Sequence, residues 1–280
     1  MPLRILFIGD IVGKPGRVMV QRAVPALIAK WELDLVIANA ENAAAGSGLN
    51  AECYQEITQA GVQVLTMGDH IYKKKEIMPL LHNHSHILKP ANFPPEAPGA
   101  DFVIVPARDG TPVAVFTVLG RIFMRPVDCP FRAADRVMQA IGDQARVVVM
   151  DMHAEATSDK HIMGRYLDGR ASAVLGTHTH VPTADETIFP GGTAYISDVG
   201  MTGPYDSVLG RRVDRVSQTA ITFVPTHFDV ATGDPRLCGA KIEIDAQSGR
   251  ALAIERVMIR EAEANALAAS SADESATPDA

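Results

Sequence analysis

The segment LRILFIGD (Leu3–Asp10) indicates the class of fold. It is a short, mostly apolar run of strand-forming residues that ends in a glycine followed by an acid. Two later apolar runs, Leu33–Ala38 and Val62–Met67, are also followed by acidic or amide residues. Strands that alternate with helices on this spacing predict βαβ units and a partly parallel sheet. The intervening helices are expected at Val18–Glu32, which contains Pro25, at Ala51–Ala60 and at Lys73–Leu81.

The second half of the chain repeats this pattern with more strand character. Phe102–Pro106 and Val113–Leu119 predict neighbouring strands joined by a turn at Asp109-Gly110. The succession of elements has no internal repeat and favours a single domain over residues 1–260. The other expected elements are a helix at Phe131–Ile141, strands at Arg146–Met150 and Ala171–Leu175, and a hairpin of Lys241–Ile244 and Ala253–Ile259.

The composition is that of a folded protein with an acidic balance. The 280 residues are 47% hydrophobic, which excludes disorder over most of the length, and the net charge of −7 excludes a simple basic surface for duplex nucleic acid. Only 5% are aromatic, which argues against a base-stacking platform for single strands. Five acids and no Lys or Arg lie in residues 261–280, where Leu267 is the single large hydrophobic residue. We expect this tail to be disordered, with an isolated helix as the alternative.

The cysteines and the N-terminus indicate the compartment. Cys53, Cys129 and Cys238 are widely separated and form no CxxC pair, so reduced thiols are expected. The chain runs from Met1 directly into an apolar strand, and it has no run of about 18 apolar residues. A cytoplasmic protein without a membrane segment is therefore predicted.

Polar residues of ligand type follow five of the predicted strands. In open α/β sheets, ligands bind outside the carboxyl ends of the strands, so these residues are expected to converge. Seven or eight oxygen and imidazole groups are too many for one zinc ion and suggest two metal ions that share a carboxylate. Such a pair is suited to phosphoryl chemistry. The converging residues are Asp10, Glu41, Asn42, Asp69, His70, His153, His178 and His180.

Two further motifs imitate binding sites. Gly9-x-x-x-Gly13-Lys14-Pro15 is similar to a phosphate-binding P-loop, but it has one residue too few between the glycines and a proline where Ser or Thr is needed. His82-x-His84-x-His86 follows a predicted helix and has no acids beside it, so it is expected to be a surface loop or turn.

These motifs resemble the calcineurin-like metallophosphoesterases and, more narrowly, their bacterial YmdB-like branch. The resemblance covers roughly residues 3–260. It implies a four-layer αββα sandwich of two mixed β-sheets with a di-metal centre. The blocks that carry the resemblance are GDIVGKPGR (Gly9–Arg17), NAENAAAGSGL (Asn39–Leu49), LGRIFM (Leu119–Met124), MHAEATSDK (Met152–Lys160), GTHTHVPTAD (Gly176–Asp185) and GTAYISDVGMTGPYDSVLG (Gly192–Gly210).

The resemblance also implies an activity and a set of ligands. The activity is phosphodiesterase action on 2′,3′-cyclic nucleotides that leaves the 3′-phosphate, by attack of a hydroxide that bridges the metals. Iron or manganese is expected, with magnesium or zinc as alternatives. Asp10, Glu41, Asn42 and His180 would hold one metal, and Glu41 would bridge to a second metal held by Asp69, His153 and His178.

One residue departs from the family pattern. The usual motif is Gly-Asn-His, whereas this chain has Gly68-Asp69-His70. Aspartate still offers an oxygen ligand but adds a negative charge. We therefore expect tighter metal retention and weaker Lewis acidity than the asparagine version would give.

The remaining site residues have alternative roles. His70 is expected to be the catalytic histidine beside the phosphate, or only to orient a ligand carboxylate. Glu155 or Thr157 could orient His153, unless this segment only caps a helix. The loop Asp198–Pro204 could line the substrate pocket or be an ordinary turn. Candidate substrate contacts are Lys14, Arg17, Thr202 and Gly203.

Three classes of function remain at this stage. The first is a di-metal phosphodiesterase of small cyclic nucleotides. The second is a broader phosphomonoesterase or nuclease on the same centre, and the third is a metal-dependent regulatory protein that binds a nucleotide. No duplex nucleic acid and no membrane are expected as partners, and a homo-oligomer is left open.

Overall fold

Strand β1 (Leu3–Ile8) lies inside the first β-sheet, between β12 and β2. The computed structural model describes residues 2–275. Strands β1 to β4 are mutually parallel, whereas β12 is antiparallel to β1. The carboxyl ends of β1, β2 and β3 therefore lie at one edge. In spatial order the strands are β11 (Gly203–Asp206), β12 (Gly233–Ile244), β1 (Leu3–Ile8), β2 (Leu35–Asn39), β3 (Val64–Thr66) and β4 (Ile87–Leu88), with β13 (Ala251–Arg260) paired to β12.

The second β-sheet is also mixed. Strands β6, β7, β8 and β10 are parallel, and the edge strands β5 and β9 are antiparallel to their neighbours. The predicted hairpin of β5 and β6 is confirmed, with Phe102 opposite Phe116. In spatial order the strands are β5 (Phe102–Pro106), β6 (Pro112–Leu119), β7 (Val147–His153), β8 (Ala173–Thr177), β10 (Ala194–Ile196) and β9 (Thr187–Ile188).

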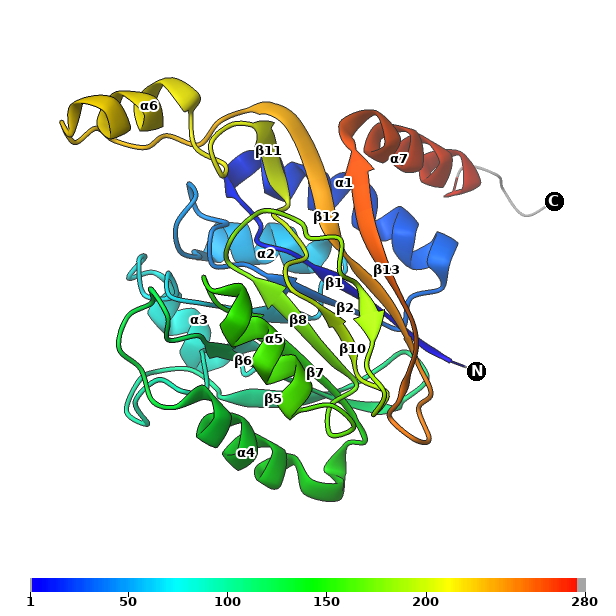
Figure 1. Ribbon diagram of the computed structural model, residues 1–280. Coiled ribbons are helices and arrows are strands. Elements are labelled where there is room, and N and C mark those ends of the chain that lie inside the picture. The colour runs from blue at the N-terminus through cyan, green and yellow to red at the C-terminus, as the bar shows by residue number, and fades with distance from the viewer. Residues whose placement is uncertain (1, 276–280) are drawn as a thin grey trace.

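Alternation along β1 shows how the layers form. Ile5 and Phe7 pack between the two sheets, whereas Leu6 and Ile8 pack beneath helices on the outer face. Helices α1 (Gly13–Trp31), α2 (Ala51–Gln59), α3 (Ile77–Asn83) and α7 (Glu261–Ser275) cover the first sheet, and α4 (Pro130–Ile141) and α5 (Thr157–Tyr166) cover the second. The predicted four-layer αββα sandwich is confirmed (Figure 1).

Several element boundaries differ from the sequence predictions. Helix α1 begins at Gly13 rather than Val18, because Pro15 lies in the first turn, where a backbone N–H has no partner within the helix. Strand β7 continues to His153 rather than ending at Met150. The short strands β9, β10 and β11 and helix α6 (Val213–Thr222), which projects from the body in Figure 1, were not predicted.

The prediction of a disordered tail is wrong for Glu261–Ser275, which forms α7. Ala264 is fully buried, and Leu267 packs against the core beneath α1. Arg22 of α1 donates hydrogen bonds to Glu261 and Asn265 at 3.1 and 3.0 Å. Helix α7 can be stabilised by these few apolar residues because it packs against α1. Residues 276–280 lie outside the described residues, and the domain boundary at residue 260 stays a prediction.

Candidate metal centre

The seven predicted metal ligands lie together where the carboxyl ends of both sheets meet. Asp10, Glu41 and Asp69 follow β1, β2 and β3 of the first sheet. His153 ends β7, and His178 follows β8 directly. Parallel strands in two facing sheets therefore bring residues from distant parts of the chain to one place.

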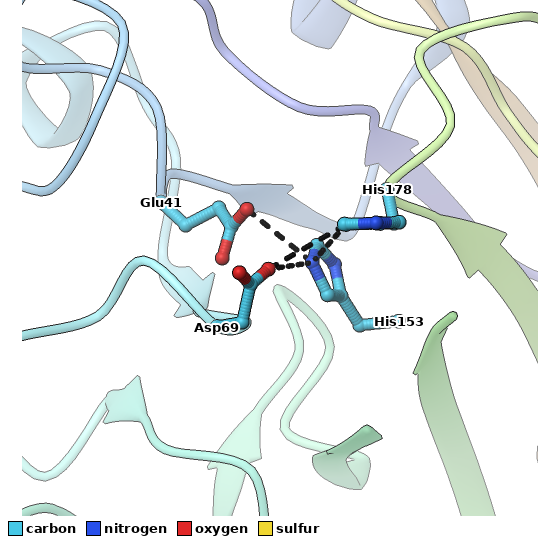
Figure 2. Close-up of side chains that lie close together, drawn as sticks. All are labelled: Glu41, Asp69, His153 and His178. Atoms are coloured by element: carbon cyan, nitrogen blue, oxygen red, sulfur yellow. Dashed lines mark hydrogen bonds and ion pairs between the residues drawn. The ribbon is translucent and has the colours of Figure 1, made fainter. Parts of the chain in front are cut away.

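Four of these side chains form a compact group, shown in Figure 2. Glu41, Asp69, His153 and His178 each offer a ligand atom, and these atoms lie within 4.8 Å of one another. His153 Nε2 lies 3.3 Å from Glu41 Oε1 and 3.4 Å from Asp69 Oδ1. His178 Nδ1 lies 3.1 Å from the same His153 nitrogen. These four residues could hold a metal ion.

A second group adjoins the first through Glu41. Asn42 Nδ2 lies 3.3 Å from Glu41 Oε1 and 3.3 Å from His180 Nε2. His180 Nε2 in turn lies 3.7 Å from Asp10 Oδ1. The Glu41 carboxylate thus stands between Asp10, Asn42 and His180 on one side and the compact group on the other.

The donor set fits hard or borderline cations. Asp10 is fully buried, and its Oδ1 has no hydrogen-bond partner within residues 2–275. Its other oxygen accepts a hydrogen bond from the backbone N–H of His178 at 3.1 Å. An unpartnered buried carboxylate oxygen is costly unless a cation compensates it. With only oxygen and imidazole ligands and no thiolate, the site suits manganese, iron, magnesium or zinc.

The electrostatics of the buried ligands point the same way. Burial raises the pKa of Asp10, but the contact with His180 and the charge of His153 lower it below the usual value. Burial lowers the pKa of His153, yet the charge of Glu41 and the hydrogen bond with Asp69 raise it well above its usual value. The acids therefore create a strongly negative potential at the centre of the site, which favours positive charge there.

His70 lies beside this centre without belonging to the compact group. Its Nδ1 lies 2.7 Å from Asn42 Oδ1, and its backbone N–H donates to Glu41 Oε2 at 2.9 Å. Because an amide oxygen only accepts, Nδ1 carries the proton in this contact and Nε2 is directed elsewhere. Nε2 lies 3.7 Å from Asp69 Oδ2, and the side chain is 30% exposed. His70 can therefore meet a ligand while its ring is held by a metal-site residue.

A cavity of about 240 Å³ opens over the site. Its size is sufficient for a small phosphate-bearing group. Arg211 is the cation in its wall, and its guanidinium donates to the backbone carbonyls of Ala45 and Phe228 at 3.3 and 2.9 Å. The lining residues are Val12, Glu41, Asn42, Gly46, His70, Glu155, His178, Thr179, His180, Leu209 and Arg211.

His153 is oriented by residues that the sequence analysis missed. Its Nδ1 lies 2.8 Å from Thr177 Oγ1, and Thr177 donates to Asp151 Oδ1 at 2.6 Å. Asp151 is fully buried, and burial raises its pKa to about 6. The sequence carried a signal, because Asp151 and His153 are two apart on one strand and so share a face.

The predicted roles of Glu155 and Thr157 toward His153 are wrong. Glu155 Oε2 instead lies 3.2 Å from His178 Nε2. Thr157 is the first residue of α5, and the residue that precedes the helix, Ala156, makes no side-chain cap. The helix-cap alternative for Thr157 is therefore also wrong, by one position.

Thr177→Val is expected to weaken Mn²⁺ binding by about 10- to 100-fold, because His153 loses the hydroxyl that sets its orientation. Isothermal titration calorimetry measures this affinity. Thr117→Val is the matched control, since Thr117 is also fully buried but its hydroxyl has no partner among the described residues. Equal affinities of the Thr177 variant and the wild type would contradict this role.

The segment Gly176–His180 reaches the site through strained backbone. His178 and His180 have φ values of 94° and 65°, in the left-handed region that costs a non-glycine residue about 1–3 kcal/mol. His180 Nδ1 lies 3.0 Å from the backbone carbonyl of Leu209, which can only accept, so this nitrogen carries the hydrogen and Nε2 faces Asp10. Two of the non-glycine residues with positive φ are therefore histidines expected to bind metal.

The chain is similar over nearly its whole length to known proteins. A family model described as YmdB-like protein matches residues 6–257. A 2′,3′-cyclic-nucleotide 2′-phosphodiesterase of Bacillus subtilis is 46% identical over 259 residues, which is 92% of this chain and 98% of the relative. The chain therefore belongs to the YmdB-like family.

Two solved structures resemble this YmdB-like chain closely. A hypothetical protein from Thermus thermophilus has a TM-score of 0.87 and 42% identity, covering 92% of this chain and 100% of the other. A novel phosphatase of Mycoplasma pneumoniae has the same TM-score with 30% identity, covering 93% and 94%. The fold and the family predicted from the sequence motifs are both confirmed.

The candidate substrate contacts of this YmdB-like chain lie outside the cavity wall. Arg17 forms an ion pair with Glu56 and donates to the Ala43 carbonyl at 2.6 Å. Thr202 is fully buried, and its hydroxyl donates to the Cys238 carbonyl at 3.1 Å. Gly203 is buried against Val12, and Lys14 is exposed on α1. Thr202 and Gly203 are both buried, so the structure does not support them as substrate contacts.

The histidine triplet His82-x-His84-x-His86 lies at the end of α3, away from the candidate metal centre. His84 and His86 stack around Tyr54 at the end of α3, and His86 Nε2 lies 2.8 Å from Tyr54 Oη. The prediction of a surface loop or turn is confirmed for His84 and His86, which follow α3, but it is wrong for His82, which lies in the last turn of that helix. Among residues 2–275, no helix combines the length and the apolar character needed to span a membrane.

Proposed function

We propose that this chain is a metal-dependent phosphodiesterase that hydrolyses 2′,3′-cyclic nucleotides to 3′-nucleotides at a two-cation centre. One observation carries the proposal: Glu41 stands between two groups of ligand-type residues, and His70 lies beside them facing the cavity. The activity of the Bacillus relative supports a phosphoric diester hydrolase.

The two groups would hold the cations. Glu41, Asp69, His153 and His178 would bind one, and Asp10, Asn42 and His180 would bind the other with Glu41 shared. When bound, such a pair supplies positive charge for the phosphate and activates a water molecule as nucleophile. Manganese or iron is the expected metal, because both accept this mixture of carboxylate, amide and imidazole.

The chain's own residues would bind and protonate the substrate. His70 holds a proton on Nδ1 against Asn42, so its Nε2 can present a second proton to the leaving ribose oxygen. Arg211 places a positive charge in the cavity wall, where a phosphate or its neighbouring groups would bind. The small cavity favours a mononucleotide over RNA. We place the protein in the cytoplasm and leave its oligomeric state open.

A substrate panel tests the proposal. Protein loaded with Mn²⁺ or Fe²⁺ is assayed against 2′,3′-cyclic AMP, 3′,5′-cyclic AMP, an aryl phosphate monoester and RNA, and the metal content is measured in parallel. We expect the 2′,3′-cyclic substrate to be hydrolysed best and to yield 3′-AMP. Preference for the monoester or for RNA would favour the broader phosphatase or nuclease. Tight nucleotide binding without turnover would favour a regulatory protein.

Asp69→Asn is expected to bind Mn²⁺ about tenfold or more weakly and to turn over at least as fast at saturating metal. The reason is charge: Asp10, Glu41 and Asp69 leave two divalent ions with a net formal charge of +1, and the asparagine version leaves +2. Metal titration followed by initial-rate measurements separates the two effects. Lower activity at unchanged metal content would overturn this interpretation.

A further inference from the structure

One residue separates the two histidines that serve different parts of the metal centre. His178 belongs to the group with Glu41, Asp69 and His153, whereas His180 faces Asp10 and Asn42. Thr179 lies between them, and both flanking residues have left-handed backbone. The position of Thr179 therefore sets where the two imidazoles stand relative to each other.

Thr179 is held by Asp198. The Oδ2 atom of Asp198 accepts hydrogen bonds from the Thr179 backbone N–H at 3.1 Å and from its hydroxyl at 2.7 Å. The Oδ1 atom accepts from the backbone N–H of Gly200 at 2.8 Å. Asp198 is 1% exposed, so its carboxylate is almost completely shielded from water. The carboxylate fixes both the backbone and the side chain of Thr179.

Lys160 provides the opposite charge. Its Nζ lies 2.6 Å from Asp198 Oδ2, and both side chains are 1% exposed. Lys160 comes from α5, and its aliphatic stem runs beneath Gly176, where a Cβ would lie 2.9 Å from Lys160 Cδ. The side chain thus passes under the segment that carries the histidines and ends at the group that anchors it.

We propose that Lys160 and Asp198 form a positioning pair that fixes the spacing between the two cation subsites by holding Thr179. The inference rests on the proposed two-cation centre. A carboxylate in this dry place needs a compensating charge, because breaking a buried pair leaves an unpaired ion. Without Lys160, the Asp198 carboxylate would move or bind water. Its hydrogen bonds to Thr179 would weaken, and His178 and His180 would then be less firmly positioned.

The pair also acts on the charge near the site. Lys160 neutralises the Asp198 carboxylate. The anchor can therefore be strong without adding net negative charge beside a metal-binding imidazole.

Mn²⁺ binding measured by calorimetry, together with the electron paramagnetic resonance spectrum of the loaded protein, tests the pair. Lys160→Met is expected to weaken binding of at least one ion by 10- to 100-fold and to change the exchange-coupled signal of the Mn²⁺ pair. Lys89→Met is the matched control. Lys89 is also a buried lysine, but its printed partners are Asp101 at 3.1 Å and the Pro94 carbonyl at 3.4 Å rather than Asp198.

Thr179 gives a second test that leaves the buried charges intact. Thr179→Val removes only the hydroxyl donor and is expected to weaken binding several-fold, whereas Thr179→Ser keeps the donor and should bind as the wild type does. Circular dichroism of each metal-free variant establishes that it is folded.

The outcomes separate the pair from the proposed function. Two ions in the wild type, with weaker binding in the Lys160 and valine variants and normal binding in the serine and Lys89 variants, would support the positioning role. Two ions in the wild type and unchanged affinity and spectra in folded Lys160 and valine variants would overturn it. Fewer than two ions in the wild type would contradict the two-cation centre and, with it, this inference.

Discussion

Replacing Glu41 by glutamine is expected to lower turnover of 2′,3′-cyclic AMP by about 10³-fold or more. Glu41 is 1% exposed and lies within reach of both groups of ligands, so the change disturbs the whole centre at once. The amide keeps the shape of the side chain but loses the charge that a shared ligand needs. Steady-state kinetics and metal analysis of the same preparations measure the effect.

The matched control is Glu52→Gln, because Glu52 is an exposed glutamate in the first turn of α2. It should behave as the wild type in both measurements. If Glu41→Gln retained a full complement of metal and more than a tenth of the activity, Glu41 would not be the shared ligand.

His70→Ala is expected to lower kcat by about 10²- to 10⁴-fold while the metal content stays unchanged. The effects on kcat and on metal content can be separated, because His70 bonds to Asn42 and Glu41 but is not a member of the compact group. If the imidazole supplies the proton to the leaving oxygen, the limb of the pH–rate profile that reports this acid should disappear in the variant. Rates measured across pH, with metal analysis beside them, test both parts.

A second histidine controls for general effects of the substitution. His82 is exposed near the end of α3 and lines no part of the cavity, so His82→Ala should leave the profile unchanged. Near-full turnover of His70→Ala at every pH would show that His70 does not act as the acid. Loss of metal in that variant would instead favour the alternative in which His70 only orients a ligand carboxylate.

The residues at the strand ends could be predicted because their signal is local. Asp10, Glu41 and Asp69 each follow an apolar run closely, and parallel topology then brings such positions to one edge. His153 and His178 could be placed in the same way. The sequence pattern therefore predicted a partly parallel sheet and the group of residues that gathers at its edge, whereas the four-layer sandwich was implied by the resemblance to the metallophosphoesterases.

Asp151 left a signal two residues from His153, but other supporting contacts could not be predicted because the partners are distant in sequence. Thr177 reaches His153 only because β7 and β8 pair in the register that sets these two residues opposite each other. The sequence favours Arg17 as a phosphate contact, but in the structure Arg17 pairs with Glu56, which lies 39 residues away. Likewise, α7 contacts Arg22 of α1, which lies 239 residues before Glu261.

The division of the proposed metal ligands between the two sheets would have a thermodynamic consequence. Asp10, Glu41, Asn42 and Asp69 come from the first sheet, and His153, His178 and His180 come from the second. Neither sheet alone carries the set, so a cation held by both cross-links them across the core. By linkage, an ion present at a hundredfold excess over its dissociation constant would stabilise the docked sheets by about 2.7 kcal/mol. Metal binding and the stability of the two packed sheets would therefore be thermodynamically linked.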